Sequence, residues 1–407
     1  MATDIRDTTY AVEAAGVMRL LPTRPQVLAL GEPTHGEETL LELRNELFRQ
    51  LVEQEGYRTI AIESDCMAGL LVDAYATSGT GTLDEVMEHG FSHTDLGLGA
   101  SAANRELVRW ARAFNLGRSP SDHVRFAGFD GPLEITHAAS PRQALTSLHA
   151  YLATHLVDPG LLPCTAETLD HLLGDDDPWV NPAAMMDPAQ SVGQSREAKE
   201  LRLLADDLGA LLDAQTPHLL AVTSRDDWDR ARLYGRTATG LLRYHHGMAD
   251  ASPSRMARLV GLRDLMMAQN LLALAERGPT LVHAHNSHLQ RTASTMRMWD
   301  QPLLEWWSAG ALVNSRLGEG ERYAFVATAL GTLPHQGVDA PPPDTVEGLL
   351  YALPEDRLLI DAPRLAAALG TPLPAPRVSP WFGYAPLDPA QLTGIDGLVF
   401  LGDVRRD

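Results

Sequence analysis

The sequence is short of cysteine, of positive charge and of long apolar runs, and each shortage argues against a class of protein. Only Cys66 and Cys164 occur among the 407 residues, with no CxxC pair, which argues against a disulfide framework and a cysteine-rich zinc site. Basic residues number 33 against 53 acidic ones, and the net charge of −20 should repel nucleic acid and anionic membranes. No run approaches the roughly 20 apolar residues of a membrane span.

Several catalytic signatures are also missing. The sequence has no GxSxG elbow, no GxGxxG after its first apolar run, no GxxxxGK[ST] loop and no HExxH pair. These absences argue against serine hydrolases of the α/β type, dinucleotide enzymes and P-loop NTPases. The N-terminal segment lacks a signal-peptide pattern, so a cytoplasmic protein is expected. What remains is chemistry carried by histidine and carboxylate.

Short, nearly continuous apolar runs alternate with helical patterns, and this alternation indicates the fold class. Continuous rather than alternating apolar runs are typical of strands covered on both faces. We therefore predict an α/β fold with a mostly parallel sheet flanked by helices. The predicted strands are 26–31, 58–64, 123–130, 279–286, 322–328 and 397–403. The clearest predicted helices are 37–56, 101–117 and 254–278.

Residues 136–250 break this alternation, because strand signals fade and helical patterns dominate. We predict an inserted helical subdomain at 136–250, with residues 1–135 and 251–407 forming an α/β core that carries the active site. The insertion either lines one side of the active-site cleft or only stabilises the fold. Both interpretations stay open from the sequence.

Ionisable residues follow four of the predicted strands. Ligands of open parallel sheets bind at the carboxyl ends of the strands, so these residues should meet at one edge. A convergent catalytic site is the best explanation of four such endings. The residues are Glu32 and His35 after the first strand, Glu63 and Asp65 after the second, Asp130 after the third, and His283, His285 and His288 around the fourth.

The segment GEPTHG at residues 31–36 is the first candidate for the site. Gly31 and Gly36 flank it as expected hinges, and a helix should begin just beyond it. The positive end of that helix should favour neutral His35, whereas a nearby Glu63 would raise the pKa of His35 again. His35 is thus a candidate general base near neutral pH. Spacing alone favours a solvated Arg44 over one that reaches back to the carboxylates.

The segment HAHNSH at residues 283–288 is the second candidate. His283 and His285 share one face of the predicted strand, and His288 follows its end. Three close histidines fit either a metal site or a hydrogen-bonded acid–base cluster, and the spacing leaves both open. For His283 we favour a satisfied core histidine without a chemical role.

Six segments together resemble the erythromycin esterase family, within the wider group of EreA-like and ChaN-like α/β proteins. They occur in the family's order and at similar spacing over most of the chain. The segments are GEPTHG (31–36), IESD (62–65), NRELVRWARAFN (104–115), FAGFD (126–130), RDLMMAQN (263–270) and HAHNSH (283–288).

The resemblance implies hydrolysis of an ester or macrolactone by histidine-activated water, with no cofactor and no metal. It implies that His35 is the general base, Glu63 its partner, and His285 the residue that binds or polarises the carbonyl or the leaving group. The residues expected to bind or support the substrate are Glu32, Arg44, His288 and Asp130, the last of which closes a matching strand. The expected partner is a small molecule, such as a macrolide or another polyketide-like natural product, with neither nucleic acid nor membrane involved.

Other functions remain open on the same scaffold. A biosynthetic lyase or cyclase could use the same histidine and glutamate on a natural-product intermediate. A metallohydrolase could use His35, His285 or His288 as ligands, and a binding module could sequester its ligand without turnover. The composition, rich in Ala, Leu, Arg and Pro, is typical of high-GC actinobacteria, where such genes serve antibiotic resistance or biosynthesis. Nothing in the sequence indicates the oligomeric state.

Overall fold

The computed structural model describes residues 7–92, 101–134, 137–297, 303–318 and 322–404. The chain divides into two compact units. Unit 1 comprises residues 1–63, 69–128 and 271–407, and unit 2 comprises 64–68 and 129–270. The predicted insertion at 136–250 lies within the sequence range of unit 2, which also takes in most of the helix that follows. Among the described residues, no helix is both long and apolar enough to span a membrane.

An eight-stranded, mostly parallel sheet forms the centre of unit 1, which confirms the predicted fold class. Its strand order is β1-β9-β10-β8-β2-β5-β3-β4. Strands β2, β5, β3, β8 and β10 pair in parallel, whereas β9 runs antiparallel to β10 and to β1. The strands are β1 (Thr9–Tyr10), β2 (Val27–Glu32), β3 (Thr59–Asp65), β4 (Arg125–Asp130), β5 (Thr280–His285), β8 (Tyr323–Thr332), β9 (Arg357–Asp361) and β10 (Gly397–Asp403). All six predicted strands are present within a few residues of their expected bounds.

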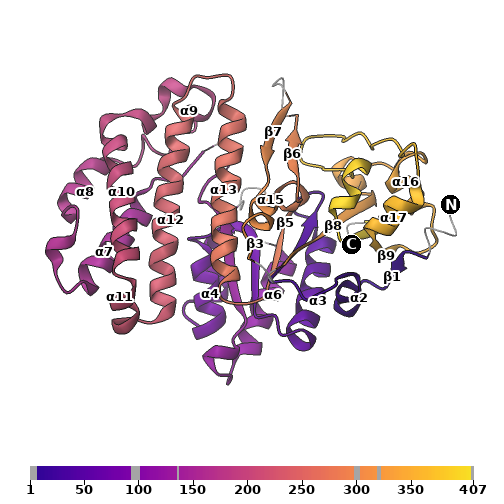
Figure 1. Cartoon of the computed structure of the whole chain (residues 1–407), viewed down its shortest axis with the longest axis horizontal. Coiled ribbons are helices and arrows are strands. Elements are labelled where there is room, and N and C mark those ends of the chain that lie inside the picture. Colours follow the sequence, from indigo (N-terminus) through magenta and orange to yellow (C-terminus); the bar gives the residue numbers. More distant parts are fainter. Residues whose placement is uncertain (1–6, 93–100, 135–136, 298–302, 319–321, 405–407) are drawn as a thin grey trace. The chain divides into compact units, whose positions relative to one another are not determined.

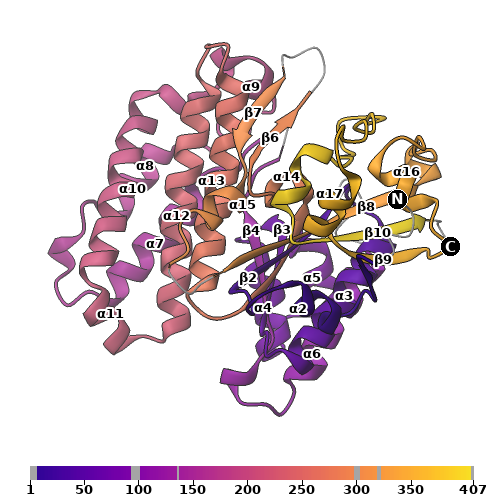
Figure 2. The same ribbon diagram turned by 45° about the vertical axis from the view of Figure 1, so that its right-hand side comes forward.

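A separate antiparallel hairpin also belongs to unit 1. Strands β6 (Ala293–Met296) and β7 (Leu304–Trp307) pair with each other and with no strand of the main sheet. Figure 2 shows them as a two-stranded ribbon beside the C-terminal loops drawn in yellow. The hairpin follows directly from α14 (Asn286–Leu289), so it extends the polypeptide that leaves the carboxyl end of β5.

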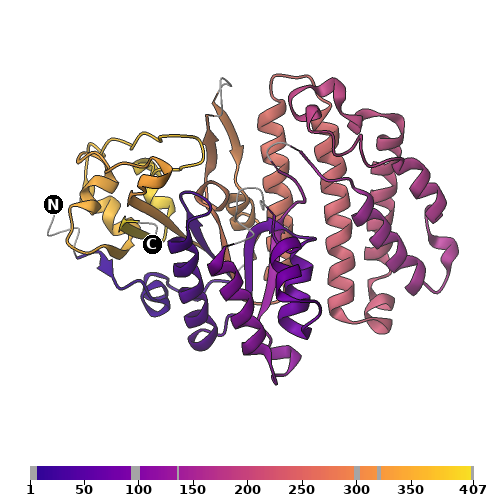
Figure 3. The same cartoon turned by 180° about the vertical axis from the view of Figure 1, so that it is seen from behind.

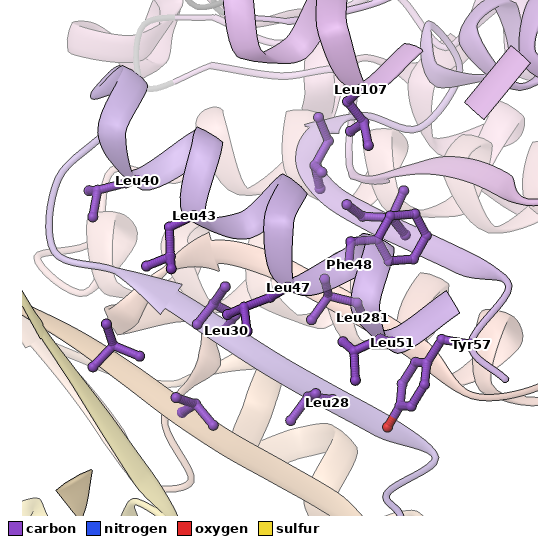
Figure 4. Close-up of a cluster of buried hydrophobic side chains, with 14 of the residues drawn as sticks. Leu28, Leu30, Leu40, Leu43, Leu47, Phe48, Leu51, Tyr57, Leu107 and Leu281 are labelled. Atoms are coloured by element: carbon purple, nitrogen blue, oxygen red, sulfur yellow. The ribbon is translucent and has the colours of Figure 1, made fainter. Parts of the chain in front are cut away.

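Helix α3 (Glu38–Gln54) begins just after the first predicted site segment and covers one face of the sheet. Its leucines at 40, 43, 47 and 51 recur at helical spacing and are at most 4% exposed. They pack over Leu28 and Leu30 of β2 and Leu281 of β5 (Figure 4). The helix therefore fixes the end of β2 and the turn that joins the two elements.

The remaining helices of unit 1 are shorter, and Figure 3 shows the indigo and purple ones, α2 to α6, in front of the strands. They are α2 (Ala14–Leu20), α4 (Gly69–Ser78), α5 (Leu83–His89), α6 (Ala102–Asn115), α14 (Asn286–Leu289), α15 (Ala309–Asn314), α16 (Val346–Tyr351) and α17 (Ala362–Leu369). Two short 3-10 helices matter for the site: η6 (Pro334–Gln336) and η7 (Pro389–Gly394).

Unit 2 is helical and has its own apolar core. Leu145, Leu148, Leu201 and Leu208 are fully buried in it. Figure 1 shows its longer helices running side by side. The helices are α7 (Arg142–His155), α8 (Ala166–Leu173), α9 (Ala183–Met186), α10 (Arg196–Ala214), α11 (Thr216–Val222), α12 (Arg225–Met248) and α13 (Arg255–Ala275), the last of which ends in unit 1.

Candidate active site

Three neighbouring strands bring the first candidate residues together. Strands β2, β5 and β3 are consecutive in the sheet, and Glu32 at the end of β2 is in register with His285 at the end of β5. Glu63 lies near the end of β3, on the other side of β5. Residues that are more than 200 positions apart in the chain thus meet because parallel strands end at a common edge.

His35 is the most exposed member of this cluster, and Glu32 fixes its orientation. Its Nδ1 lies 2.7 Å from Oε1 of Glu32, and its side chain is 35% exposed. A carboxylate only accepts hydrogen bonds, so Nδ1 carries the proton and Nε2 is the acceptor. Gly36 follows with a φ of 75°, a conformation that strains other residues by about 1 kcal/mol or more. Gly36 is thus the hinge that was predicted.

Glu63 contacts three histidines of the cluster. Its Oε2 accepts a 2.9 Å hydrogen bond from the backbone N–H of His285. Its Oε1 lies 3.4 Å from Nε2 of His288 and 3.8 Å from Nε2 of His35. The side chain of Glu63 is only 5% exposed, so its charge acts at short range and with little screening by solvent. The predicted partnership of Glu63 with His35 is therefore geometrically available.

His285 is held as a neutral ring with a defined tautomer. Its Nε2 lies 3.2 Å from the carbonyl oxygen of Pro33, which can only accept, so Nε2 carries the proton. Its Nδ1 lies 2.7 Å from the hydroxyl of Ser287. Burial, together with the nearby His35 ring, lowers the pKa of His285 to about 3. The His35 and His285 rings are 5.2 Å apart, so a proton donor lies beside the candidate base.

His283 also contacts the cluster, although a core position without a chemical role was favoured for it. Its Nε2 lies 3.6 Å from Oε2 of Glu32, an atom that is buried and has no hydrogen-bond partner among the described residues. Burial lowers the pKa of His283 to about 4, although the Glu32 charge opposes this. Burial by itself would raise the pKa of Glu32, but His283 and His35 outweigh it and the net pKa is lowered. Glu32 is thus a carboxylate between two histidines.

Arg44 is 1% exposed, and the solvated position favoured from its spacing is wrong. Its guanidinium donates to the side-chain oxygens of Asn45 and Asn104, both at 2.8 Å. Burial lowers its pKa to about 10, and the charge of Glu32 partly offsets this effect. Since Arg44 remains charged at neutral pH, it supplies positive potential to the buried Glu32 carboxylate. The supporting role that the family resemblance implied for Arg44 stays a prediction.

Gly31 has a different role from the predicted hinge. It lies within β2, and a Cβ added to it would come 2.1 Å from Oδ1 of Asn286. The Asn286 amide donates 2.9 Å to the carbonyl of Thr328, and its oxygen accepts 3.3 Å from the N–H of the same residue. Pairing of β2 with β8 ends at Leu30, so this side chain continues the ladder where the two strands separate. Gly31 leaves the room for it.

The turn that carries His35 is fastened by η6. Thr34 donates 2.7 Å to Oε1 of Gln336, and Gln336 donates 3.4 Å to the carbonyl of His35. His335 lies 2.8 Å from Oε2 of Glu37. The turn contacts are completed by a 2.7 Å bond from the Ala385 N–H to the Pro33 carbonyl. No sequence signal identified these partners, because they lie about 300 positions further along the chain.

Asp65 and Asp130, the other strand-end carboxylates, belong to unit 2. Asp130 is 1% exposed, and its Oδ2 lies 2.6 Å from Nη2 of Arg263 within the same unit. Asp65 accepts 2.6 Å from the N–H of Met67. The part of Asp130 in substrate support stays a prediction. Within the described ranges, no group of three or more His, Cys, Asp or Glu side chains is arranged to hold a metal ion.

A cavity of about 640 Å³ lies beside this cluster, entirely within unit 1. Its wall includes His285 and Ser287 at one end. The loop from Pro376 to Leu387, between α17 and η7, supplies much of the rest. Its volume is within the range of roughly 300–1,000 Å³ that is usual for small-molecule sites.

The fold and the cluster together define an α/β protein with a histidine–carboxylate site at the carboxyl edge of its sheet. The model of the erythromycin esterase family matches residues 52–401, and the chain belongs to this family. The family resemblance predicted from the motifs is thus confirmed. Membership supports a hydrolase-like function in general. The matched range begins after His35, so the assignment of His35 depends on its motif and its contacts.

Three solved structures share the fold at low sequence identity. A structural-genomics target from Bacillus cereus superposes with a TM-score of 0.72 at 17% identity, covering 100% of this chain and 98% of that one. A succinoglycan biosynthesis protein gives 0.70 at 15% identity, with coverage of 98% and 96%. A histidine-to-asparagine mutant of the erythromycin esterase EreC, in its open conformation, gives 0.63 at 17% identity, with coverage of 92% and 90%.

Proposed function

We propose that the protein hydrolyses a carboxylic ester or lactone with water activated by His35. The observation that carries this proposal is the Glu32–His35 contact at 2.7 Å, which leaves Nε2 of His35 unprotonated and 3.8 Å from Oε1 of Glu63. Nε2 of His35 and Oε1 of Glu63 are both hydrogen-bond acceptors, so they do not bond to each other. One water molecule can donate a hydrogen bond to each of them. That water is the proposed nucleophile.

In the proposed step, His35 takes the proton of the attacking water and returns it to the leaving group. Water attacks the ester carbonyl as it gives one proton to Nε2 of His35, and Glu32 stabilises the imidazolium that forms. Nε2–H of His285 can donate to the developing oxyanion. The oxyanion then replaces the Pro33 carbonyl as the acceptor of this hydrogen bond. His35 then returns the proton to the leaving alkoxide, so an acid and an alcohol result. Glu63 positions the water, and His288 contacts Glu63.

A macrolactone or another polyketide-like lactone is the proposed substrate, in line with the name of the family and of the EreC relative. Turnover of 14-membered macrolides can be followed by a mass gain of one water. In water labelled with oxygen-18, hydrolysis places one labelled oxygen in the acid product. Product formed without the label would instead identify a lyase or cyclase. Absence of turnover across a broad panel of esters and lactones would refute the proposal.

The His35→Asn variant tests the base directly. Asparagine keeps a polar side chain in the turn but cannot take a proton, so kcat should fall by about 10²–10⁴-fold or more. The circular dichroism spectrum and the unfolding midpoint should stay close to those of the wild type, because His35 is 35% exposed. His89→Asn is the matched control, since this exposed histidine on α5 lies outside the cluster. Activity of His35→Asn within a few-fold of the wild type would exclude His35 as the base.

A further inference from the structure

The cavity beside His285 has an aromatic wall that the catalytic proposal does not use. Trp381, Phe382 and Tyr384 line it from one loop, and Phe325 lines it from β8. Only 6% of the residues in the chain are aromatic, yet three of the four residues from 381 to 384 are. This concentration of aromatic residues at a cavity next to the candidate base indicates a surface that selects among ligands.

Alternation along β8 explains why the sheet contributes to this wall. Val326 points to the face covered by α3, where it joins the main apolar core. Its neighbours Phe325 and Ala327 must therefore point to the opposite face, and both line the cavity. Met296 of the β6–β7 hairpin lines it as well, and its thioether is a favourable neighbour for aromatic rings.

The loop that carries the three aromatic residues is held in place by hydrogen bonds to the rest of unit 1. The buried Arg377 donates 2.9 Å to the hydroxyl of Tyr384 and 2.7 Å to the carbonyl of Leu330 at the end of β8. Ser379 donates 2.6 Å to the carbonyl of Tyr384. The buried Glu347 accepts 2.9 Å from the N–H of Leu387. A preformed wall avoids the cost of ordering a loop when a ligand binds.

Gly383 sets the position of the Trp381 indole. A Cβ added at Gly383 would lie 1.5 Å from Cζ3 of Trp381, so the ring lies directly over this glycine. The indole remains 40% exposed and Phe382 41% exposed, which is high for large apolar side chains. The two rings meet edge to face with their centroids 5.9 Å apart. The glycine therefore lets the indole lie against the backbone.

Polar groups of the cavity are largely engaged within the protein. The Gln290 amide donates to the carbonyl of Ala293 at 2.9 Å, and the Ser287 hydroxyl is bonded to His285. The guanidinium of Arg377 donates to backbone carbonyls and to Tyr384. The exposed rings of Trp381 and Phe382 thus offer apolar surface to a ligand. Flat rings are the groups that gain most from such faces, by offset stacking or edge-to-face contact.

We propose that this cavity binds the non-reacting arm of the ester substrate, and that this arm carries a planar aromatic or conjugated ring. The inference rests on the proposed ester hydrolysis, because it places the scissile carbonyl at the His285 end of the cavity. It narrows the proposed substrate class to lactones and esters that carry a flat apolar ring a few bonds from the reacting carbonyl.

Two matched pairs of esters test the proposal. Ethyl 4-phenylbutanoate is compared with ethyl 4-cyclohexylbutanoate, and 4-phenylbutyl acetate with 4-cyclohexylbutyl acetate. Within a pair the reacting carbonyl is the same and the ring differs mainly in shape and π-character. In one of the two pairs, kcat/KM should favour the phenyl ester by about tenfold. A ratio near one in both pairs would overturn the proposal.

Substitutions locate the source of the preference. Trp381→Ala should bring the phenyl-to-cyclohexyl ratio to within about twofold of one, and Gly383→Ala should lower it by displacing the indole. Trp307→Ala is the matched control, because this exposed tryptophan of β7 does not line the cavity and its loss should leave the ratio unchanged. An unchanged ratio in Trp381→Ala would refute the assignment of the subsite.

A binding measurement separates failure of this inference from failure of the proposed reaction. Equilibrium dialysis with 4-phenylbutanol needs no turnover and can be performed with the His35→Asn protein. The ring compound should bind to the wild type and to His35→Asn, and Trp381→Ala should weaken its binding about tenfold. Binding without hydrolysis of any ester would contradict the proposed reaction while supporting the ring site. No difference between the wild type and Trp381→Ala would contradict the ring site itself.

Discussion

At the scale of single residues, Glu32 makes the contacts that join two histidines of the site. One oxygen contacts Nδ1 of His35 at 2.7 Å, and the other lies 3.6 Å from Nε2 of His283. Arg44 adds a positive charge from α3. A carboxylate that orients a base must itself be immobile, so we propose that His283, which lies behind Glu32, contributes to the rate through its position. The sequence pattern of His283 suggested only a core role.

Replacement of His283 should therefore affect turnover more than binding. The His283→Leu variant removes the only neighbour of Glu32 Oε2 that the described contacts provide, and kcat should fall about tenfold with KM within about twofold. His283→Gln, which keeps a polar side chain beside Glu32, should recover part of the loss. Loss of His283 removes an electrostatic interaction that lowers the pKa of Glu32, so the acid limb of the kcat profile should move to higher pH. A change in KM alone, or no rescue by glutamine, would show that His283 only packs.

Sequence reasoning predicted the residues whose side chains sit at strand ends and missed those whose role depends on long-range contacts. Glu32, Glu63 and His285 follow directly from the rule that parallel strands end at one edge. Arg44 was placed in solvent because helical spacing gives no information on what buries a face. The contact of Gln336 with the turn that carries His35 could not be predicted, because these two distant segments meet only in the folded chain.

At the scale of elements, the sheet depends on one side chain where its hydrogen-bond ladder is interrupted. Strands β2 and β8 pair from Val27 to Leu30, after which the Asn286 amide takes over as donor and acceptor for Thr328. These hydrogen bonds fix the position of α14, and with it that of His285 and His288, relative to the sheet. The β2 end, the β5 end and β8 are thereby joined.

The Asn286→Asp variant tests this link. The carboxylate has nearly the same shape but cannot donate to the Thr328 carbonyl, and it is almost buried at 9% exposure. The free energy of unfolding should fall by about 1–3 kcal/mol, because an acceptor then faces an acceptor. Urea unfolding monitored by circular dichroism measures the loss. Ser315→Ala, an exposed substitution in the same unit, should change the stability by less than about 0.5 kcal/mol. Equal stability of Asn286→Asp and the wild type would show that the bridge adds nothing.

Elements were predictable in proportion to their length and periodicity. Helix α3 and the six longer strands appeared within a few residues of their predicted bounds, because each has a repeated apolar pattern. The two-residue edge strand β1, the five-residue strand β9 and the β6–β7 hairpin were missed, since such short segments carry little periodic signal. The hairpin and the 376–387 loop, which line the cavity, are therefore the parts of the site that only the structure provides.

At the scale of the whole molecule, buried neutral histidines occur in both units. His283 and His285 lie in the sheet of unit 1, and His245 lies in α12 of unit 2, where its Nε2 donates 2.8 Å to the carbonyl of Ala139. Burial lowers the pKa of His245 and His283 to about 4 and that of His285 to about 3. Unfolding returns each ring to an ordinary pKa near 6.5. The three side chains thus couple folding to pH.

The sign of this coupling follows from proton uptake. Between pH 6.5 and the lowered values, the unfolded chain binds protons that the folded chain does not, so stability falls as the pH falls toward about 4. Above pH 6.5 the contribution of the histidines is fully present. Each of the three histidines should lower the free energy of unfolding by about 2 kcal/mol at pH 5, which is large beside a typical stability of about 5–15 kcal/mol.

Urea midpoints at pH 7, 6 and 5 should therefore decrease steadily. His283→Leu should flatten the trend by about a third, and His89→Asn, at an exposed histidine, should leave it unchanged. Equal midpoints at pH 7 and pH 5 would mean that these rings gain protons without opening the fold.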